Sequence, residues 1–187
     1  MKWKRLQNLP ENKFRRIVGV KHKTLLWGYF DWCNWKSNWT SKKKQRLYYS
    51  GKKKRHTLKT QVIVDKKSEK IICTSLSNGK CHDFRLFKEL DIKISETIKA
   101  VTDTGYLGLQ KIHHNTYMPK KKSKKRPLTL EDKQQNRELS HQWVLNEHVI
   151  GKIKRFKILS DKYRNRRKRF GLRFNLISGI YNYELGN

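Results

Sequence analysis

Two acidic residues in this chain have the type and setting that metal-assisted phosphodiester chemistry requires. Asp103 lies near the end of a short β-rich segment, AVTDTGY (residues 100–106), and Glu147 lies in the helical pattern NEHVIGKIKRF (residues 146–156). Carboxylates on a strand end and on a facing helix can hold divalent metal ions that clamp the attacking and leaving oxygens of an in-line displacement. Their hard oxygen atoms suit Mg²⁺ or Mn²⁺. Asp103 and Glu147 are therefore the candidate catalytic and metal-binding residues.

Basic residues follow Glu147 on the same predicted helix. Lys154 comes seven residues later, two turns along the same face, so its ammonium group can reach a phosphate beside the metal ions, with Arg155 next to it. The same spacing also fits a plainer interpretation, in which Asp103 closes an Asx turn and Glu147 pairs with the basic residues that follow it. Spacing alone favours this plainer interpretation.

The charge balance points to a polyanionic partner. The 187 residues include 46 Lys and Arg against 15 Asp and Glu, which gives a formal net charge of +31. This excess is large for an enzyme that acts on small molecules, and nucleic acid is the polyanion that it fits best. The basic residues are interleaved with apolar ones along the chain, so they belong to the folded body and not to a basic tail.

The cysteines and the hydropathy pattern predict a cytoplasmic protein near the nucleoid. Cys33, Cys73 and Cys81 contain no CxxC pair, which argues against a disulfide framework and against a zinc site. No apolar run reaches membrane-spanning length, and the N-terminus lacks the apolar core of a signal peptide. We therefore expect no membrane association.

Two basic segments are candidates for contacts with backbone phosphates. Lys52, Lys53 and Lys54 lie in the turn SGKKKRH (residues 50–56), and Arg164 and Arg167 lie in the run YRNRRKR (residues 163–169). Phosphate contacts position DNA without reading its sequence. The alternative is that these runs are simply solvated surface.

The hydrophobic patterning predicts an α/β domain with no convincing strand before residue 56. His82 and Asp83 open an amphipathic segment, where Asp83 suits the positive end of a helix better than it suits catalysis. In chain order we expect a small helical piece in residues 1–25, strands at 56–65 and 71–77, a helix at 82–90, a short strand within 100–106, a basic loop at 119–129, and helices at 130–159 and 163–184.

Longer stretches of the chain resemble the catalytic part of bacterial insertion-sequence transposases of the DDE class. The resemblance rests on RLYYSGKKKRHTLKTQVIVDKKSEKIICTSLSNGKCHDFRLFKE, on AVTDTGYLGLQKIH and on NEHVIGKIKRFKILSDKYRNRRKRFGLRFNLISGIYNYEL, and it covers about residues 42–187. It implies an RNase H-like fold, a mixed sheet flanked by helices, with two Asp and one Glu that bind Mg²⁺ or Mn²⁺. It also implies endonucleolytic cleavage and strand transfer on duplex DNA with terminal inverted repeats. By this resemblance Asp103 is the second Asp, Glu147 is the Glu, and Lys154 is the lysine of the signature that follows.

Two departures from the family pattern affect the expected site. Trp143 stands where the family has an arginine, and Ser140 stands where it has a tyrosine. The first Asp belongs on a strand within a pattern like LIDATE, where this chain has FDWCNWK. Asp31 is a possible stand-in, but it lies one position before the lost Asp, and a shift of one residue reverses the face of a strand. We therefore expect a disrupted first strand and impaired catalysis.

The tryptophan-rich segment FDWCNWKSNWT (residues 30–40) suggests how the first Asp was lost. If Trp32, Trp35 and Trp39 are encoded by TGA and AT-rich codons are chosen for the rest, reading residues 26–41 one base later gives YEVILIDATESPIERP, which resembles the missing strand. We therefore expect an internally deleted copy with a remnant of an N-terminal helical segment (1–25), an anomalous junction (26–41) and the catalytic domain (42–187). An aromatic platform for stacking bases is the alternative explanation of the tryptophans.

Three functions remain open from the sequence. The first is an insertion-sequence transposase whose catalysis is impaired in this copy. The second is a non-catalytic DNA-binding remnant that interferes with intact transposase by pairing with it, and homo-oligomers are equally possible. The third, a basic RNA-binding protein, would leave the segments around Asp103 and Glu147 as coincidences.

Overall fold

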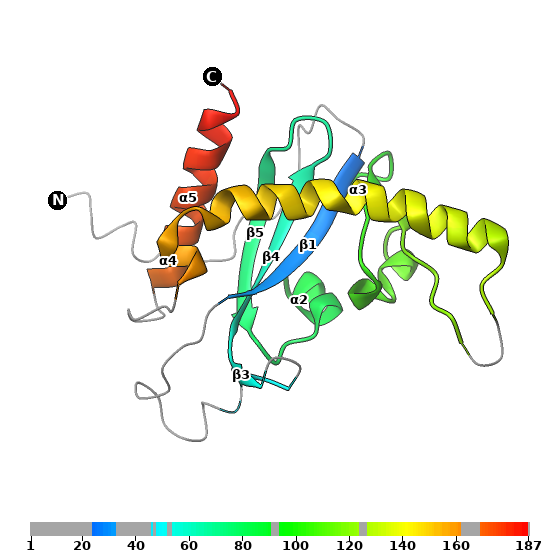
Figure 1. Cartoon of the computed structure of the whole chain (residues 1–187), viewed down its shortest axis with the longest axis horizontal. Helices are drawn as coiled ribbons and strands as arrows, with labels where there is room; N and C mark the ends of the chain where they lie inside the picture. The colour runs from blue at the N-terminus through cyan, green and yellow to red at the C-terminus, as the bar shows by residue number, and fades with distance from the viewer. Residues whose placement is uncertain are drawn as a thin grey trace.

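A mixed five-stranded sheet organises the protein, whose computed structural model describes residues 24–32, 46, 48–51, 54–90, 94–123, 127–161 and 169–186. The strand order is β5-β4-β1-β6-β7. β1 is antiparallel to β4 and parallel to β6, and β6 is parallel to β7. The bounds are β1 Thr24–Trp32, β4 Leu58–Asp65, β5 Ile71–Asn78, β6 Lys99–Val101 and β7 Thr116–Tyr117 (Figure 1).

The central strand β1 overturns the expectation of a disrupted first strand. It pairs with β4 from Leu25 opposite Asp65 to Trp32 opposite Leu58, without a break in register. Its sequence TLLWGYFDW is rich in aromatic and aliphatic residues, which suit a strand between two others. A strand that is covered on both faces has no polar face, so it lacks the alternation by which strands are usually recognised.

The β4–β5 hairpin confirms the two strands predicted from the sequence. All eight residues of β4 are buried, whereas β5 alternates between buried and half-buried positions at its start. Asp65 closes the connecting turn by accepting hydrogen bonds from the backbone N–H and the hydroxyl of Ser68, at 2.9 and 2.5 Å. The small sheet of β2 (Tyr49–Ser50) and β3 (Arg55–His56) precedes this hairpin.

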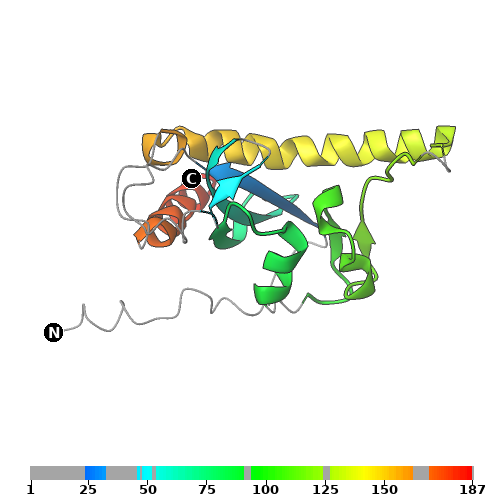
Figure 2. The same cartoon turned by 90° about the horizontal axis from the view of Figure 1, so that it is seen from below.

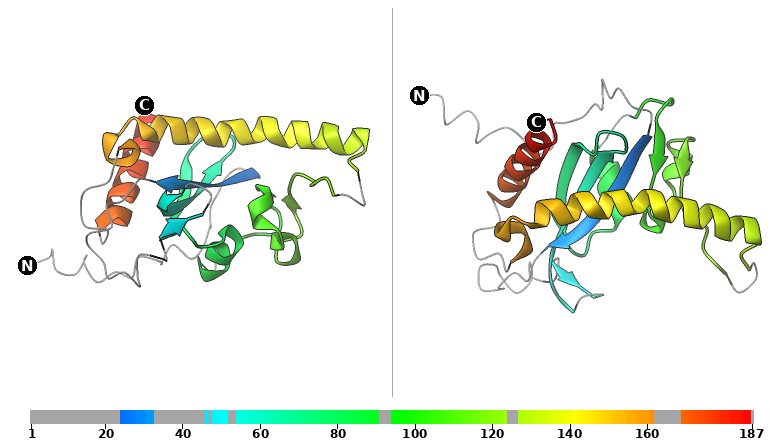
Figure 3. Two further views of the ribbon diagram at one scale, coloured as in Figure 1. Left: turned by 60° about the horizontal axis from the view of Figure 1, so that its bottom comes forward. Right: turned by 45° about the horizontal axis from the view of Figure 1, so that its top comes forward.

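Helices cover both faces of the sheet. α3 (Leu130–Lys154), α4 (Lys157–Ser160) and α5 (Phe170–Glu184) lie on one face, and α2 (Asp83–Leu90) lies on the other (Figure 2). The 3₁₀ turns η3 (Thr104–Tyr106) and η4 (Leu109–Lys111) follow β6. α3 begins with a capping box between Thr129 and Asp132, and its N-terminal half extends beyond the sheet (Figure 3).

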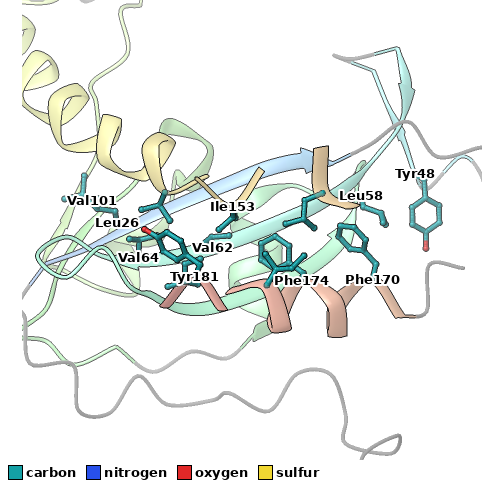
Figure 4. Packing of buried hydrophobic residues seen from close by; sticks show 14 residues of the cluster. Leu26, Tyr48, Leu58, Val62, Val64, Val101, Ile153, Phe170, Phe174 and Tyr181 are labelled. Carbon is teal, nitrogen blue, oxygen red and sulfur yellow. The ribbon is translucent and has the colours of Figure 1, made fainter. Parts of the chain in front are cut away.

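Two apolar clusters stabilise this layered arrangement. On the α3 side, Leu26 and Val62 of the sheet pack with Ile153, Phe174 and their neighbours (Figure 4). Successive strand residues point to opposite faces, so the neighbours of Leu26 on β1 pack in the second cluster, on the α2 side. Each fully buried aliphatic or aromatic side chain contributes roughly 1.5–3 kcal/mol relative to exposure.

These observations confirm the predicted fold class, an α/β sheet of RNase H-like type with flanking helices. The predicted helices are confirmed in type and shortened in extent: the one expected at 130–159 is interrupted at Arg155, and the last one is described from Phe170. The helix expected in residues 1–25 falls almost wholly outside the described residues. Within the described part of the chain, no helix is both long enough and apolar enough to cross a membrane.

Candidate functional site

Asp103 lies where the chain leaves the sheet. It follows β6 by two residues, has an extended backbone, and forms the N-terminal boundary of η3. The side chain is half-buried, and its Oδ1 accepts a hydrogen bond from the Thr104 hydroxyl at 3.0 Å. The backbone carbonyl of Asp103 accepts from the N–H of Tyr106 at 3.1 Å, which closes the 3₁₀ turn. The carboxylate therefore stands at a strand end, as the sequence predicted.

Glu147 reaches the same region of the sheet from α3. Its neighbour Asn146 is fully buried and packs directly on Gly28 of β1. Gly28 comes two residues after Leu26, just as Asp103 comes two residues after the Val101 that pairs with Leu26. α3 therefore crosses β1 level with the point at which Asp103 follows β6. The Glu147 side chain itself is exposed at the side of this contact.

A buried acidic residue, Asp83, lies close to Asp103. Lys59 donates from its Nζ to Asp83 Oδ1 at 2.7 Å and to the Cys81 carbonyl at 2.8 Å. Burial raises the pKa of Asp83, Lys59 opposes this rise, and the negative charge of Asp103 adds to it. A Cβ atom on Gly105 would collide with Asp83 Oδ2, so the start of α2 is packed against the turn that follows Asp103. Asp83 therefore supports the turn beside Asp103.

The sequence placed Asp83 at a helix start but did not anticipate its partner. Asp83 is the first residue of α2, as expected for an acidic residue at the positive end of a helix. Its ion pair with Lys59 spans 24 residues and depends on how α2 packs against β4. The only local signal was the pair His82-Asp83 ahead of an amphipathic segment, which does not identify a distant lysine.

The register of β1 places Asp31 and Trp32 within the strand. Alternate residues of a strand share one face of the sheet. Leu26 and Gly28 are on the α3 side of β1, and Trp32 lies an even number of residues after both. Asp31 has the opposite parity, which it shares with Trp27 in the cluster on the α2 side. Its backbone lies opposite Lys59 of β4. Asp31 therefore lies at a regular strand position that is out of step with Leu26 and Gly28.

The described side chains do not make a complete metal site. Asp103 and Glu147 offer the hard oxygen donors that Mg²⁺ or Mn²⁺ prefers. Within residues 24–186 and outside the gaps given above, however, no three His, Cys, Asp or Glu side chains come together as possible ligands of one ion. Divalent metal chemistry is a property of the family to which this fold belongs, and the described donors alone do not fit it.

The predicted phosphate-binding residues fall into two groups. Lys154 is exposed near the end of α3, and Arg155, which follows it, forms an ion pair with Glu184 of α5. Lys54 is exposed in the turn before β3 and has a left-handed backbone, with φ of 52°. The remaining predicted residues, Lys52, Lys53, Arg164 and Arg167, lie outside the described residues.

The mixed sheet with helices on both faces defines an RNase H-like α/β protein. Residues 36–182 match the DDE superfamily endonuclease family, and the chain belongs to this family. It is 51% identical over 144 residues to the protein called "Probable transposase for insertion sequence element IS702" from Microchaete diplosiphon. That match covers 77% of this chain and 52% of the relative, so the chain spans about half of the relative's length. No solved structure matches the chain.

Proposed function

We propose that this protein is an insertion-sequence transposase by descent whose catalytic domain, residues 42–187, has lost most of its strand-cleaving and strand-transfer activity. Membership of the DDE superfamily endonuclease family supports the ancestry. The single observation that supports the impairment is the register of β1, in which Asp31 is one residue out of phase with the alternate positions Leu26 and Gly28 on the α3 side. In this proposal residues 1–25 are a remnant of the N-terminal segment and residues 26–41 are a junction in a displaced frame, and the strand β1 (Thr24–Trp32) crosses the boundary between them.

The missing carboxylate follows from strand geometry. The resemblance places the family's first Asp at position 32, which shares its parity with Leu26 and Gly28 and is occupied by tryptophan. An indole has one N–H donor and no anionic oxygen, so it cannot ligate a metal ion. Asp31 lies one residue earlier, and in a regular strand a shift of one residue reverses the face. Trp143 on α3, where an arginine is expected, removes a phosphate-binding guanidinium as well.

DNA binding is the part of the ancestral function that this proposal retains. The net charge of +31 provides a sequence-independent attraction for duplex DNA, and the terminal inverted repeats of the element are the proposed substrate. Lys154 and Arg155 at the end of α3 and Lys54 before β3 are the described residues that would contact phosphates. The family implies a divalent metal ion, Mg²⁺ or Mn²⁺ in this proposal, for which Asp103 and Glu147 would be two of the ligands, and the cytoplasm near the nucleoid is the proposed location.

A second candidate function is a DNA-binding remnant without any catalysis, which interferes with intact transposase by pairing with it. The same register of β1 favours it, because a site that lacks one carboxylate can keep its DNA-binding surface. The two candidates differ in residual activity. A remnant binds DNA equally well after Asp103→Ala or in the presence of a chelator, whereas an impaired enzyme shows weak cleavage that both treatments abolish.

The decisive experiment measures cleavage of end-labelled duplex DNA that carries the inverted repeats of the element, with Mg²⁺ and with Mn²⁺. We expect little or no cleavage by the natural chain and an increase after Trp32→Asp, which places a carboxylate where the resemblance puts the family's first Asp. Asp103→Ala should abolish this gain. Trp35→Asp, which adds the same charge outside β1, is the matched control. Efficient cleavage by the natural chain that is lost on Asp103→Ala would overturn the impairment.

A further inference from the structure

The last helix, α5, is apolar on two opposite faces. Phe170, Phe174, Ile177 and Tyr181 are buried against the sheet and α3. On the other face Leu172 is 71% exposed, Leu176 65%, Ile180 39% and Tyr183 71%. At 3.6 residues per turn these four side chains fall within an arc of roughly 100°. A helix that is apolar all round is normally covered on all sides, so the exposed stripe of Leu172, Leu176, Ile180 and Tyr183 calls for a partner.

Gly179 lies in the middle of this stripe. It is exposed, and a Cβ added to it would meet no atom within 4 Å, so the packing of the chain itself does not require glycine there. Glycine inside a helix is less favourable than alanine. A glycine on a helix surface is useful where a second helix approaches closely, because it leaves room for the facing side chain. The stripe therefore combines large apolar residues with one gap.

The stripe is complementary to itself when it is reversed. Leu172, Leu176, Gly179 and Tyr183 are spaced by four, three and four residues, which is the same in either direction. This spacing is the seam of a left-handed helix pair. If a second α5 lies antiparallel, Leu172 meets Tyr183 and Leu176 meets Gly179, each twice. A large side chain then faces the gap on the partner helix at both central positions.

The exposed stripe itself carries no charge. Arg173 and Glu184 are the only charged residues of α5, and Glu184 forms an ion pair with Arg155 of its own chain. Helix α5 is therefore neutral in a chain of net charge +31, which lowers the electrostatic cost of bringing two copies together there. Antiparallel helix dipoles favour the reversed arrangement.

We propose that the exposed stripe of α5 is a homodimer interface, at which two copies of this chain pair their α5 helices antiparallel about a twofold axis. The occupant is a second copy because the stripe has the same spacing in both directions, which sets a large side chain against the Gly179 gap at both central positions, and because α5 is neutral in a strongly basic chain. The interface does not depend on catalysis, so it stands or fails separately from the proposed enzymatic function. A single helix pair is small by the standards of stable interfaces, so a concentration-dependent dimer is expected.

The experiment is sedimentation equilibrium of the full chain over a range of concentrations, after nuclease treatment and in enough salt to screen the net charge. We expect a monomer–dimer equilibrium that Leu176→Glu weakens at least tenfold. The matched control is Leu130→Glu, which changes a leucine that is 83% exposed on α3 and should leave the equilibrium unchanged. Thermal unfolding of each variant checks that the fold is retained.

Gly179→Ala gives a second and sharper test because its two expected effects have opposite signs. Alanine should raise the melting temperature of the chain at low concentration, since its Cβ meets nothing. It should also weaken the dimer several-fold by filling the gap that faces Leu176. A natural chain that stays monomeric at every concentration would overturn the proposal and would assign the stripe to a segment of a longer form of the protein. Equal effects of Leu176→Glu and Leu130→Glu would overturn it as well.

Discussion

Gly28 of β1 and Asn146 of α3 are in direct contact, and this contact sets how closely the helix that carries Glu147 approaches the sheet. The Asn146 side chain fills the space where a Cβ of residue 28 would lie. Asn146 is fully buried, and neither of its amide atoms has a hydrogen-bond partner among the described residues. The contact is therefore steric: it holds α3 by shape, one residue from the candidate catalytic glutamate.

This contact predicts that Gly28→Ala is destabilising. The new methyl group overlaps the Asn146 amide, and overpacking of this kind costs about 1–3 kcal/mol. The matched control is Gly151→Ala on α3, the helix that carries Asn146. A Cβ there meets no other atom, and stability should rise by about 0.5–1 kcal/mol. Urea denaturation of both variants measures the difference. Adding Asn146→Ala to Gly28→Ala should restore most of the loss, and a double variant as unstable as the single one would contradict the steric explanation.

The buried ion pair of Lys59 and Asp83 predicts that the substitution Asp83→Asn strongly lowers the stability of the fold. Asp83→Asn removes the carboxylate that pairs with the buried Lys59 ammonium, and breaking one side of such a pair costs about 3 kcal/mol or more. Glu89→Gln, which breaks the exposed pair with Arg85, should change stability by about 0.5 kcal/mol or less. Chemical denaturation compares the two, and Lys59→Met with Asp83→Asn should recover part of the loss. Equal effects at the two sites would show that the first pair is not buried in solution.

Tyr181 predicts a loss of stability at high pH. Burial raises the pKa of Tyr181 to about 12, and its hydroxyl donates a hydrogen bond to the Glu69 carbonyl at 3.2 Å. In the unfolded chain a tyrosine ionises near pH 10. The folded state therefore holds this proton more tightly, and its contribution is lost as pH rises from about 10 through about 12. Tyr181→Phe should flatten this part of the stability profile. Tyr183→Phe, two residues on and exposed, should leave the profile as steep as before.

Lys154 predicts a defined change in the salt dependence of DNA binding. Each phosphate that a cation neutralises contributes about one unit to the slope of log affinity against log salt concentration. Lys154→Gln on α3 should reduce this slope by about one unit for duplex DNA of any sequence. Lys88→Gln removes a charge from α2, on the opposite face of the sheet, and should leave the slope unchanged. Fluorescence anisotropy titrations at several salt concentrations measure both, and identical slopes for the two variants would exclude Lys154 from the interface.

The local patterns of the sequence predicted much of the fold. The β-rich, partly alternating residues 56–65 and the lysine-rich turn that follows identified the β4–β5 hairpin, and the apolar spacing in residues 82–90 identified α2. β1 was missed because Leu25, Leu26 and Trp27 are all buried, so this part of the strand shows no alternation of apolar and polar residues. β7 is too short for any periodicity to reveal.

The candidate site was predicted in part. The positions of Asp103 at a strand end and Glu147 on a helix followed from local sequence, and their common level on the sheet required the parallel pairing of β1 with β6. Lys59 could not be found in this way, because its partner Asp83 is 24 residues away and only the packing of α2 on the sheet brings them together. The roles of Asp103 and Glu147 in catalysis stay predictions.

The position of α5 at the end of the chain order has a consequence for how the protein is made. Phe170, Phe174, Ile177 and Tyr181 close the apolar cluster over Leu26 and Val62, and the ribosome adds these residues well after β1. At 5–20 residues per second the interval between β1 and α5 is on the order of ten seconds. During that time α5 does not yet cover the α3 side of the central strand. The nascent chain therefore needs either a chaperone or a fast pairing of β1 with β4 to stay soluble until its last helix arrives.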